Sequence, residues 1–218
     1  MESDWAAEHL QIIRTLMERT AIYRRALAPM MLLTGMIGLA AAGLGLGLRI
    51  QSPGPFIIYW MVVSLAALGG SFLLVRRQAL RDAEVFWSPP TRRVTQAMLP
   101  ALVAGLIAGI AVLLHIAPGH TGEAAEPKIA NVVGMLWLPC GWIVLYGCAI
   151  HAAGFFMPRG MKLLGWLFIL GGCGMFALGI PDLPRHIYAH GIMGFFFGAL
   201  HLAYGIYLYF TEKRKNET

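Results

Sequence analysis

The sequence IYAHGIMGFFFGALHLAYGIYLYF, residues 187–210, decides the fold class. This apolar run is longer than the roughly 20 residues that an α-helix needs to cross the hydrocarbon core of a bilayer. The basic residues Lys213, Arg214 and Lys215 follow it, as is typical of a helix that ends at the membrane surface. The run contains two histidines, at positions 190 and 201. We therefore expect a chain built of membrane-spanning helices.

The composition of the whole chain supports this expectation. Of its 218 residues, 58% are hydrophobic and only 13% are charged, and the mean hydropathy is +0.65. A soluble domain carries about 25% charged residues, so most of this chain is expected to lie in lipid. The net charge of +6 comes from short basic clusters between apolar runs, which does not indicate nucleic-acid binding. All three cysteines lie inside apolar runs, which argues against a disulfide framework or a zinc site.

Six apolar runs are separated by segments rich in proline and glycine, so we predict an all-α bundle of six transmembrane helices. Residues 1–26 are expected to form a cytoplasmic amphipathic helix, residues 27–210 the transmembrane domain, and residues 211–218 a basic cytoplasmic tail. The lipid bilayer is thus the first expected partner. The predicted spans are Leu27–Leu48, Phe56–Val75, Met98–Ala117, Ala130–Phe155, Leu163–Ile180 and Ile187–Phe210.

The distribution of basic residues predicts the orientation of the spans. Of the seventeen Lys and Arg residues, four lie in the N-terminal segment, five in the second loop, two in the fourth loop and three in the C-terminal tail. The first, third and fifth loops hold only Arg49, Lys128 and Arg185. Basic residues accumulate in cytoplasmic loops. We therefore expect both termini to lie in the cytoplasm.

The N-terminal segment is a candidate for partner binding. On a helical wheel, Trp5, Ile12 and Leu16 share an apolar arc, Arg14 lies on the opposite arc, and Arg19 lies at the border. Such a helix lies on the membrane surface or docks on a membrane or cytoplasmic protein; alternatively, it simply leads into the first span. In the second loop, RRQALRDAEVFW (residues 76–87) is expected to form a short interfacial helix. Ser88 is expected to cap a turn through Pro89 and Pro90 that leads into the third span.

The spans contain no acidic or basic residue away from their edges, so the four histidines within them are the candidates for chemistry. His190 and His201 are eleven residues apart, which places them on nearly one helix face, about 16 Å apart. With His115 and His151 on other spans, they are candidate axial ligands of haem b. The alternative is that each histidine bonds a backbone carbonyl or a hydroxyl across a helix interface. The sequence identifies no metal-binding set.

Proline and glycine within the spans predict local packing features. Pro139 is expected to kink or locally open the fourth span. The pairs Gly105–Gly109 and Gly194–Gly198 have GxxxG spacing, which allows close helix contact. We expect these pairs to pack helices within the chain rather than to form a dimer.

The motif IIRTLMERTAIYR, followed by spans with SPPTRRVTQAMLPALVAG, LPCGWIVLYG and LHLAYGI, resembles an uncharacterised family of bacterial multi-pass inner-membrane proteins. Members of that family begin with an IRxxMER-type amphipathic helix and continue with about six spans. The resemblance implies a bacterial cytoplasmic membrane and, because these genes often lie beside a winged-helix regulator, an accessory or regulatory role. His201 matches a position of the family, whereas His190, His115 and His151 do not.

Three functions remain open from the sequence. The first is a non-enzymatic inner-membrane protein of accessory or sensory/regulatory type that acts through its cytoplasmic helix. The second is a b-type haem or quinone-linked redox subunit that uses the histidines. The third is a small-molecule permease or channel around Pro139. No catalytic constellation is apparent, so we expect a protein that is not an enzyme.

Overall fold

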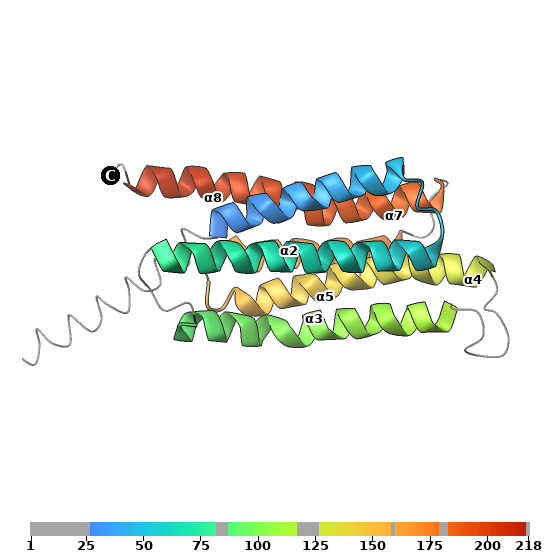
Figure 1. Cartoon of the computed structure of the whole chain (residues 1–218), viewed down its shortest axis with the longest axis horizontal. Coiled ribbons are helices and arrows are strands. Elements are labelled where there is room, and N and C mark those ends of the chain that lie inside the picture. Colours follow the sequence, from blue (N-terminus) through green and yellow to red (C-terminus); the bar gives the residue numbers. More distant parts are fainter. Residues whose placement is uncertain (1–26, 82–86, 117–126, 158–159, 179–182, 217–218) are drawn as a thin grey trace, which may run out of the picture.

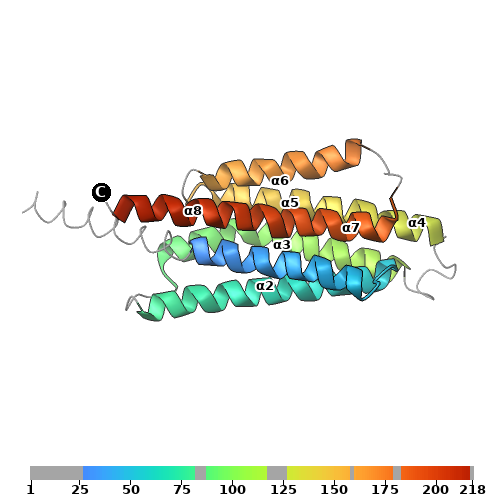
Figure 2. The same cartoon turned by 90° about the horizontal axis from the view of Figure 1, so that it is seen from above.

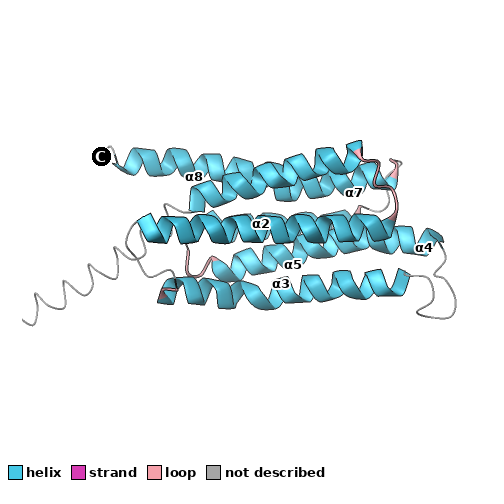
Figure 3. Cartoon of the chain, viewed as in Figure 1, coloured by secondary structure: helices cyan, strands magenta, loops and turns pink. Residues whose placement is uncertain are grey.

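The computed structural model describes residues 27–81, 87–116, 127–157, 160–178 and 183–216. These ranges are helical apart from a few turn residues and contain no strand (Figure 3). Six helices are long and apolar enough to cross a membrane (Figure 1). The chain is therefore an all-helical protein of the multi-pass membrane type. The N-terminal segment, including Trp5, Ile12, Arg14, Leu16 and Arg19, lies outside the described residues.

The six spans agree with the six predicted apolar runs. The fourth and sixth spans are each interrupted by a π-helical turn. The fifth span, α6, is the shortest of the six spans. The last helix continues beyond Phe210, so part of the expected tail extends α8. The elements are the helix Leu27–Gly47, α2 (Pro53–Arg81), α3 (Pro89–Ile116), α4 (Pro127–Val132), η1 (Val133–Trp137), α5 (Leu138–Ala153), α6 (Gly160–Ala177), α7 (Arg185–Met193), η2 (Gly194–Leu200) and α8 (His201–Asn216).

The second loop differs from its prediction. α2 continues without interruption to Arg81, so residues 76–81 extend the second span and do not start a separate interfacial helix. The physical reason is that RRQALR consists of good helix formers and contains no glycine or proline to end the helix. α3 already begins at Pro89, so the expected turn through Pro89 and Pro90 is instead the first turn of this helix. Proline fits there because the first N–H groups of a helix have no partner within the helix.

The arrangement of the helices places the N-terminal end of the first helix and the C-terminal end of α8 at the same end of the bundle (Figure 1). The end of α2 and the start of α3 lie there too. α5 packs most extensively against α6 and also contacts α3 and α7. In the view from above, α6 and α2 lie on opposite sides of the bundle (Figure 2). The fourth span is the most buried of the six, followed by the first and the sixth.

Glycines allow the Leu27–Gly47 helix to pack directly against the sixth span. A Cβ atom added at Gly35 would lie 2.6 Å from the backbone nitrogen of Leu202 and 2.9 Å from the carbonyl oxygen of Gly198. A Cβ at Gly38 would overlap the backbone of Phe197. Because the obstacles are backbone atoms, a larger residue would have to separate the two helices.

Both predicted GxxxG pairs pack helices within the chain, as expected. Gly105 and Gly109 of α3 receive the Trp142 side chain of α5: the indole Nε1–H donates to the Gly105 carbonyl oxygen at 2.8 Å, and a Cβ at Gly109 would lie 2.9 Å from the ring. Gly194 packs against the first helix, where its added Cβ would lie 2.6 Å from the Cβ of Ala42.

The contact between α5 and α6 gives a first testable prediction. A Cβ added at Gly165 would lie 2.7 Å from the backbone nitrogen of His151, whereas one at Gly174, on the same helix, meets no atom within 4 Å. We expect Gly165→Ala to lower the free energy of unfolding by about 1–3 kcal/mol, because the backbone of α5 must shift. Gly174→Ala is the matched control and should not destabilise the protein. Unfolding in mixed detergent micelles measures both, and equal effects would contradict the close contact.

Candidate functional site: two buried histidines in the bundle

The sixth span buries two histidines completely. His190, near the end of α7, and His201, the first residue of α8, both have a relative exposure of 0%. Together with Thr91, they are the polar residues buried in the described part of the chain. A polar side chain in an apolar interior needs hydrogen-bond partners, so the contacts of each ring decide what it can do.

Both ring nitrogens of His190 have partners in the bundle. The indole Nε1–H of Trp60 on α2 donates to His190 Nδ1 at 3.2 Å. The other nitrogen, Nε2, lies 3.3 Å from the carbonyl oxygen of Ile50. Because an indole only donates and a carbonyl only accepts, the network assigns the neutral tautomer with its proton on Nε2. His190 thereby links α7 to α2 and to the turn after the first helix.

The Ile50 carbonyl is placed by the end of the first helix. The backbone N–H of Ile50 donates to the Gly45 carbonyl and that of Arg49 to the Leu46 carbonyl, both at 3.1 Å, and Arg49 has a φ of 52°. This is a Schellman motif with arginine at the left-handed position that glycine usually occupies. A Cβ at Gly45 would overlap the His190 ring, so this glycine also makes room for the imidazole.

Aromatic side chains of α2 enclose the His190 ring. The ring centroid of Phe56 lies 5.0 Å from that of His190, and the centroid of Tyr59 lies 6.0 Å away, both edge to face. The Tyr59 hydroxyl donates to the Ala41 carbonyl oxygen at 2.6 Å. α2 therefore contributes three aromatic residues that hold the imidazole and the first helix together.

His201 forms a second, separate site. Its Nδ1 lies 3.1 Å from the carbonyl oxygen of Phe196, and its Nε2 lies 2.8 Å from the hydroxyl of Tyr146 on α5. The carbonyl accepts from Nδ1–H, so the neutral ring accepts the tyrosine hydroxyl at Nε2. The rings of Phe168 and Phe197 complete the enclosure, with centroids 5.4 and 6.2 Å from that of His201. His201 thus links the sixth span to α5.

π-helical turns shape the fourth and the sixth span. In the fourth span, the Leu138 N–H reaches back to the Val133 carbonyl, five residues earlier, directly before Pro139. The proline has no N–H, and its ring crowds the preceding turn, which confirms the predicted local opening there. In the sixth span, η2 lies directly before His201, and the Phe196 carbonyl that bonds this ring lies within it.

The structure does not bring the four predicted haem ligands together as ligand pairs. His115 is exposed on the outside of the bundle at the end of α3. His151 is half-buried between the edges of Phe155 and Trp166, and its Nδ1 lies 3.5 Å from the Lys162 carbonyl. A haem ligand needs an open ring nitrogen, and neither His190 nor His201 offers one in this packing. Haem ligation by these histidines stays a prediction that the packing does not support.

The contacts of the two buried histidines match the alternative to haem ligation, in which each ring bonds a backbone carbonyl or a hydroxyl across a helix interface. His190 bonds a carbonyl and His201 bonds a hydroxyl, each across a helix interface. Among the described residues, no group of three or more His, Cys, Asp and Glu side chains could hold a metal ion. As arranged, the site fixes the positions of four helices and leaves no ring nitrogen available for a reaction.

Trp60 and Tyr146, the side-chain partners of the two histidines, were not predicted from the sequence. A signal was present, because a tryptophan or tyrosine inside an apolar span needs a partner for its N–H or O–H group when buried. Which histidine each would meet depends on helix rotation and crossing, which the sequence does not reveal. Comparison with protein-family models, with curated proteins and with solved structures found no match to this chain.

The bond between Tyr146 and His201 gives a second prediction. Tyr146→Phe keeps the ring but leaves His201 Nε2 buried without a donor, so we expect the free energy of unfolding to fall by about 1–2 kcal/mol. Tyr209→Phe, which removes the hydroxyl of an exposed tyrosine on α8, is the control and should have little effect. Unfolding of both variants in the same micelles measures the difference. Equal stability of Tyr146→Phe and the wild type would contradict the assigned bond.

Proposed function

We propose that the protein is a non-enzymatic, multi-pass membrane protein of accessory or sensory/regulatory type that acts on a protein partner through its N-terminal helix. One observation carries the proposal. All four ring nitrogens of the two buried histidines bond groups within the bundle, so the most polar part of the interior serves to hold helices together. The bundle then acts as a frame that presents its polar ends.

The proposed orientation places in the cytoplasm the end of the bundle where the first helix starts and α8 ends. This end of the bundle includes Arg76, Arg77 and Arg81 at the end of α2, and Arg92 and Arg93 at the start of α3. The accumulation of basic residues at one end supports the orientation. The assignment to a bacterial inner membrane rests on the family resemblance alone.

The proposed partner interaction is tested by changing the apolar arc of the N-terminal helix. Ile12→Glu with Leu16→Glu removes that arc but keeps Arg24 and Arg25, which help to orient the first span. We expect the amount of partner protein that co-purifies with the tagged chain from its native membrane to fall about tenfold or more, because an interface depends on a few buried apolar anchors. Quantitative mass spectrometry measures the loss.

The control for this experiment is Gln11→Ala, which changes the opposite face of the same helix. This variant should retain the co-purifying proteins. The folded bundle is checked in every variant by its melting temperature, which should not change. If the proteins recovered with the double variant equal those recovered with the wild type, the N-terminal helix is not the partner-binding element.

The redox alternative has a direct test. We expect the protein, purified from cells with ample haem supply, to show no Soret band and no change between its oxidised and reduced visible spectra, because the buried imidazole nitrogens are already bonded. Iron analysis of the same sample should give far less than one atom per chain. A Soret band that is lost in His190→Gln or His201→Gln would show that these histidines hold haem, and would contradict the proposed function in favour of a redox function. The permease hypothesis around Pro139 stays a prediction.

A further inference from the structure

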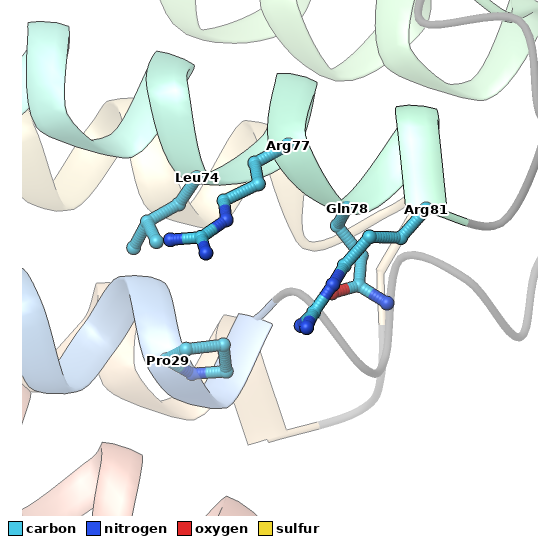
Figure 4. Close-up of a pocket in the computed structure, with 5 residues that line it drawn as sticks. All are labelled: Pro29, Leu74, Arg77, Gln78 and Arg81. Carbon is cyan, nitrogen blue, oxygen red and sulfur yellow. The ribbon is translucent and has the colours of Figure 1, made fainter.

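A pocket of about 300 Å³ lies between the start of the Leu27–Gly47 helix and the end of α2. Its walls combine two guanidinium groups and an amide with apolar carbon: the lining residues are Pro29, Leu74, Arg77, Gln78 and Arg81. Figure 4 shows the side chains of Arg77 and Arg81 extending from α2 toward the helix that carries Pro29. Both arginines therefore contribute to one concave surface between two helices.

The spacing and charge of these arginines suit a phosphate group. Arg77 and Arg81 are four residues apart on α2, which places them on one face of the helix. In the described part of the chain the one acidic residue is Glu212 on α8, and Asp82 lies outside it. Guanidinium groups bind phosphate oxygens through paired, charge-assisted hydrogen bonds. The pocket thus offers two such donors beside the apolar carbon atoms of Pro29 and Leu74.

The depth of the pocket points to a lipid as the source of that phosphate. The apolar run of α2 ends at Val75, directly before Arg76 and Arg77, so the pocket lies where hydrocarbon gives way to headgroups. Leu74 lies one turn toward the membrane and can contact the glycerol and acyl carbons of the same lipid. A volume of 300 Å³ is at the small end of ligand pockets, which suits one headgroup phosphate better than a nucleotide.

We propose that this pocket binds the phosphate of an anionic phospholipid, with Arg77 and Arg81 as the phosphate ligands. Basic pockets between transmembrane helices are established places for anionic headgroups. The bound lipid would join the first helix to α2 at this end of the bundle. This proposal does not depend on the protein having the accessory function proposed above.

The test is a lipid titration of the detergent-purified full chain by native mass spectrometry, with phosphatidylglycerol and phosphatidylcholine as the two probes. We expect the first phosphatidylglycerol to bind about tenfold more tightly than phosphatidylcholine. Arg77→Gln with Arg81→Gln should remove this preference. The control is Arg76→Gln with Arg92→Gln, which removes the same charge at the same end of the bundle. Both arginines are exposed and do not line the pocket, so this variant should keep the preference for phosphatidylglycerol.

Two results would overturn the proposal. If both double variants lose the preference equally, the lipid responds to the overall charge of this end and not to the pocket. If inorganic phosphate or glycerol phosphate at millimolar concentration displaces the lipid from the wild type, the pocket serves a free phosphate. Melting temperatures in phosphatidylcholine nanodiscs show that the variants are folded, so a loss of binding is assigned to the arginines.

Discussion

The backbone contact between the Leu27–Gly47 helix and the sixth span is the constraint on which the rest of the bundle depends. In lipid, helices gain little from burying apolar surface against one another, so close packing and hydrogen bonds must hold them. Gly35 and Gly38 let the first helix reach the backbone of the sixth span. That approach brings the turn at Ile50 to the His190 ring. Without the glycines, the ring would lose its acceptor.

Burying two imidazoles in such a bundle is costly unless every ring nitrogen is bonded. Trp60 and the Ile50 carbonyl meet this need for His190, and Tyr146 and the Phe196 carbonyl meet it for His201. The two rings use opposite tautomers, so each bond has one correct donor and one correct acceptor. Rotation of any of these helices would break a bond. The histidines therefore specify one packing among the many that apolar helices could adopt.

Much of the fold could be predicted because hydropathy alone marks the spans, and a helix satisfies its own backbone in lipid. The partners on other helices could not be predicted in the same way, because Tyr146, Trp60 and Ile50 lie 55 to 140 residues from their histidines and the contacts depend on helix rotation. The turn that presents Ile50 gave no signal either, since Arg49 occupies its left-handed position. The predicted second span ends at Val75, before a run of charged residues, but α2 continues to Arg81 because the residues of this run favour helix.

The first helix connects the basic pocket with the His190 site. One of its ends carries Pro29, which lines the basic pocket, and the other leads to Ile50, which bonds His190. The helix is about 30 Å long and packs along its length against the sixth span, so it behaves as one rigid element. A molecule held between Pro29 and Arg81 thus acts on the same element that orders the interior. The helix begins at Leu27, two residues before Pro29, so the candidate lipid site lies at the end of the helix that follows the N-terminal segment in the sequence.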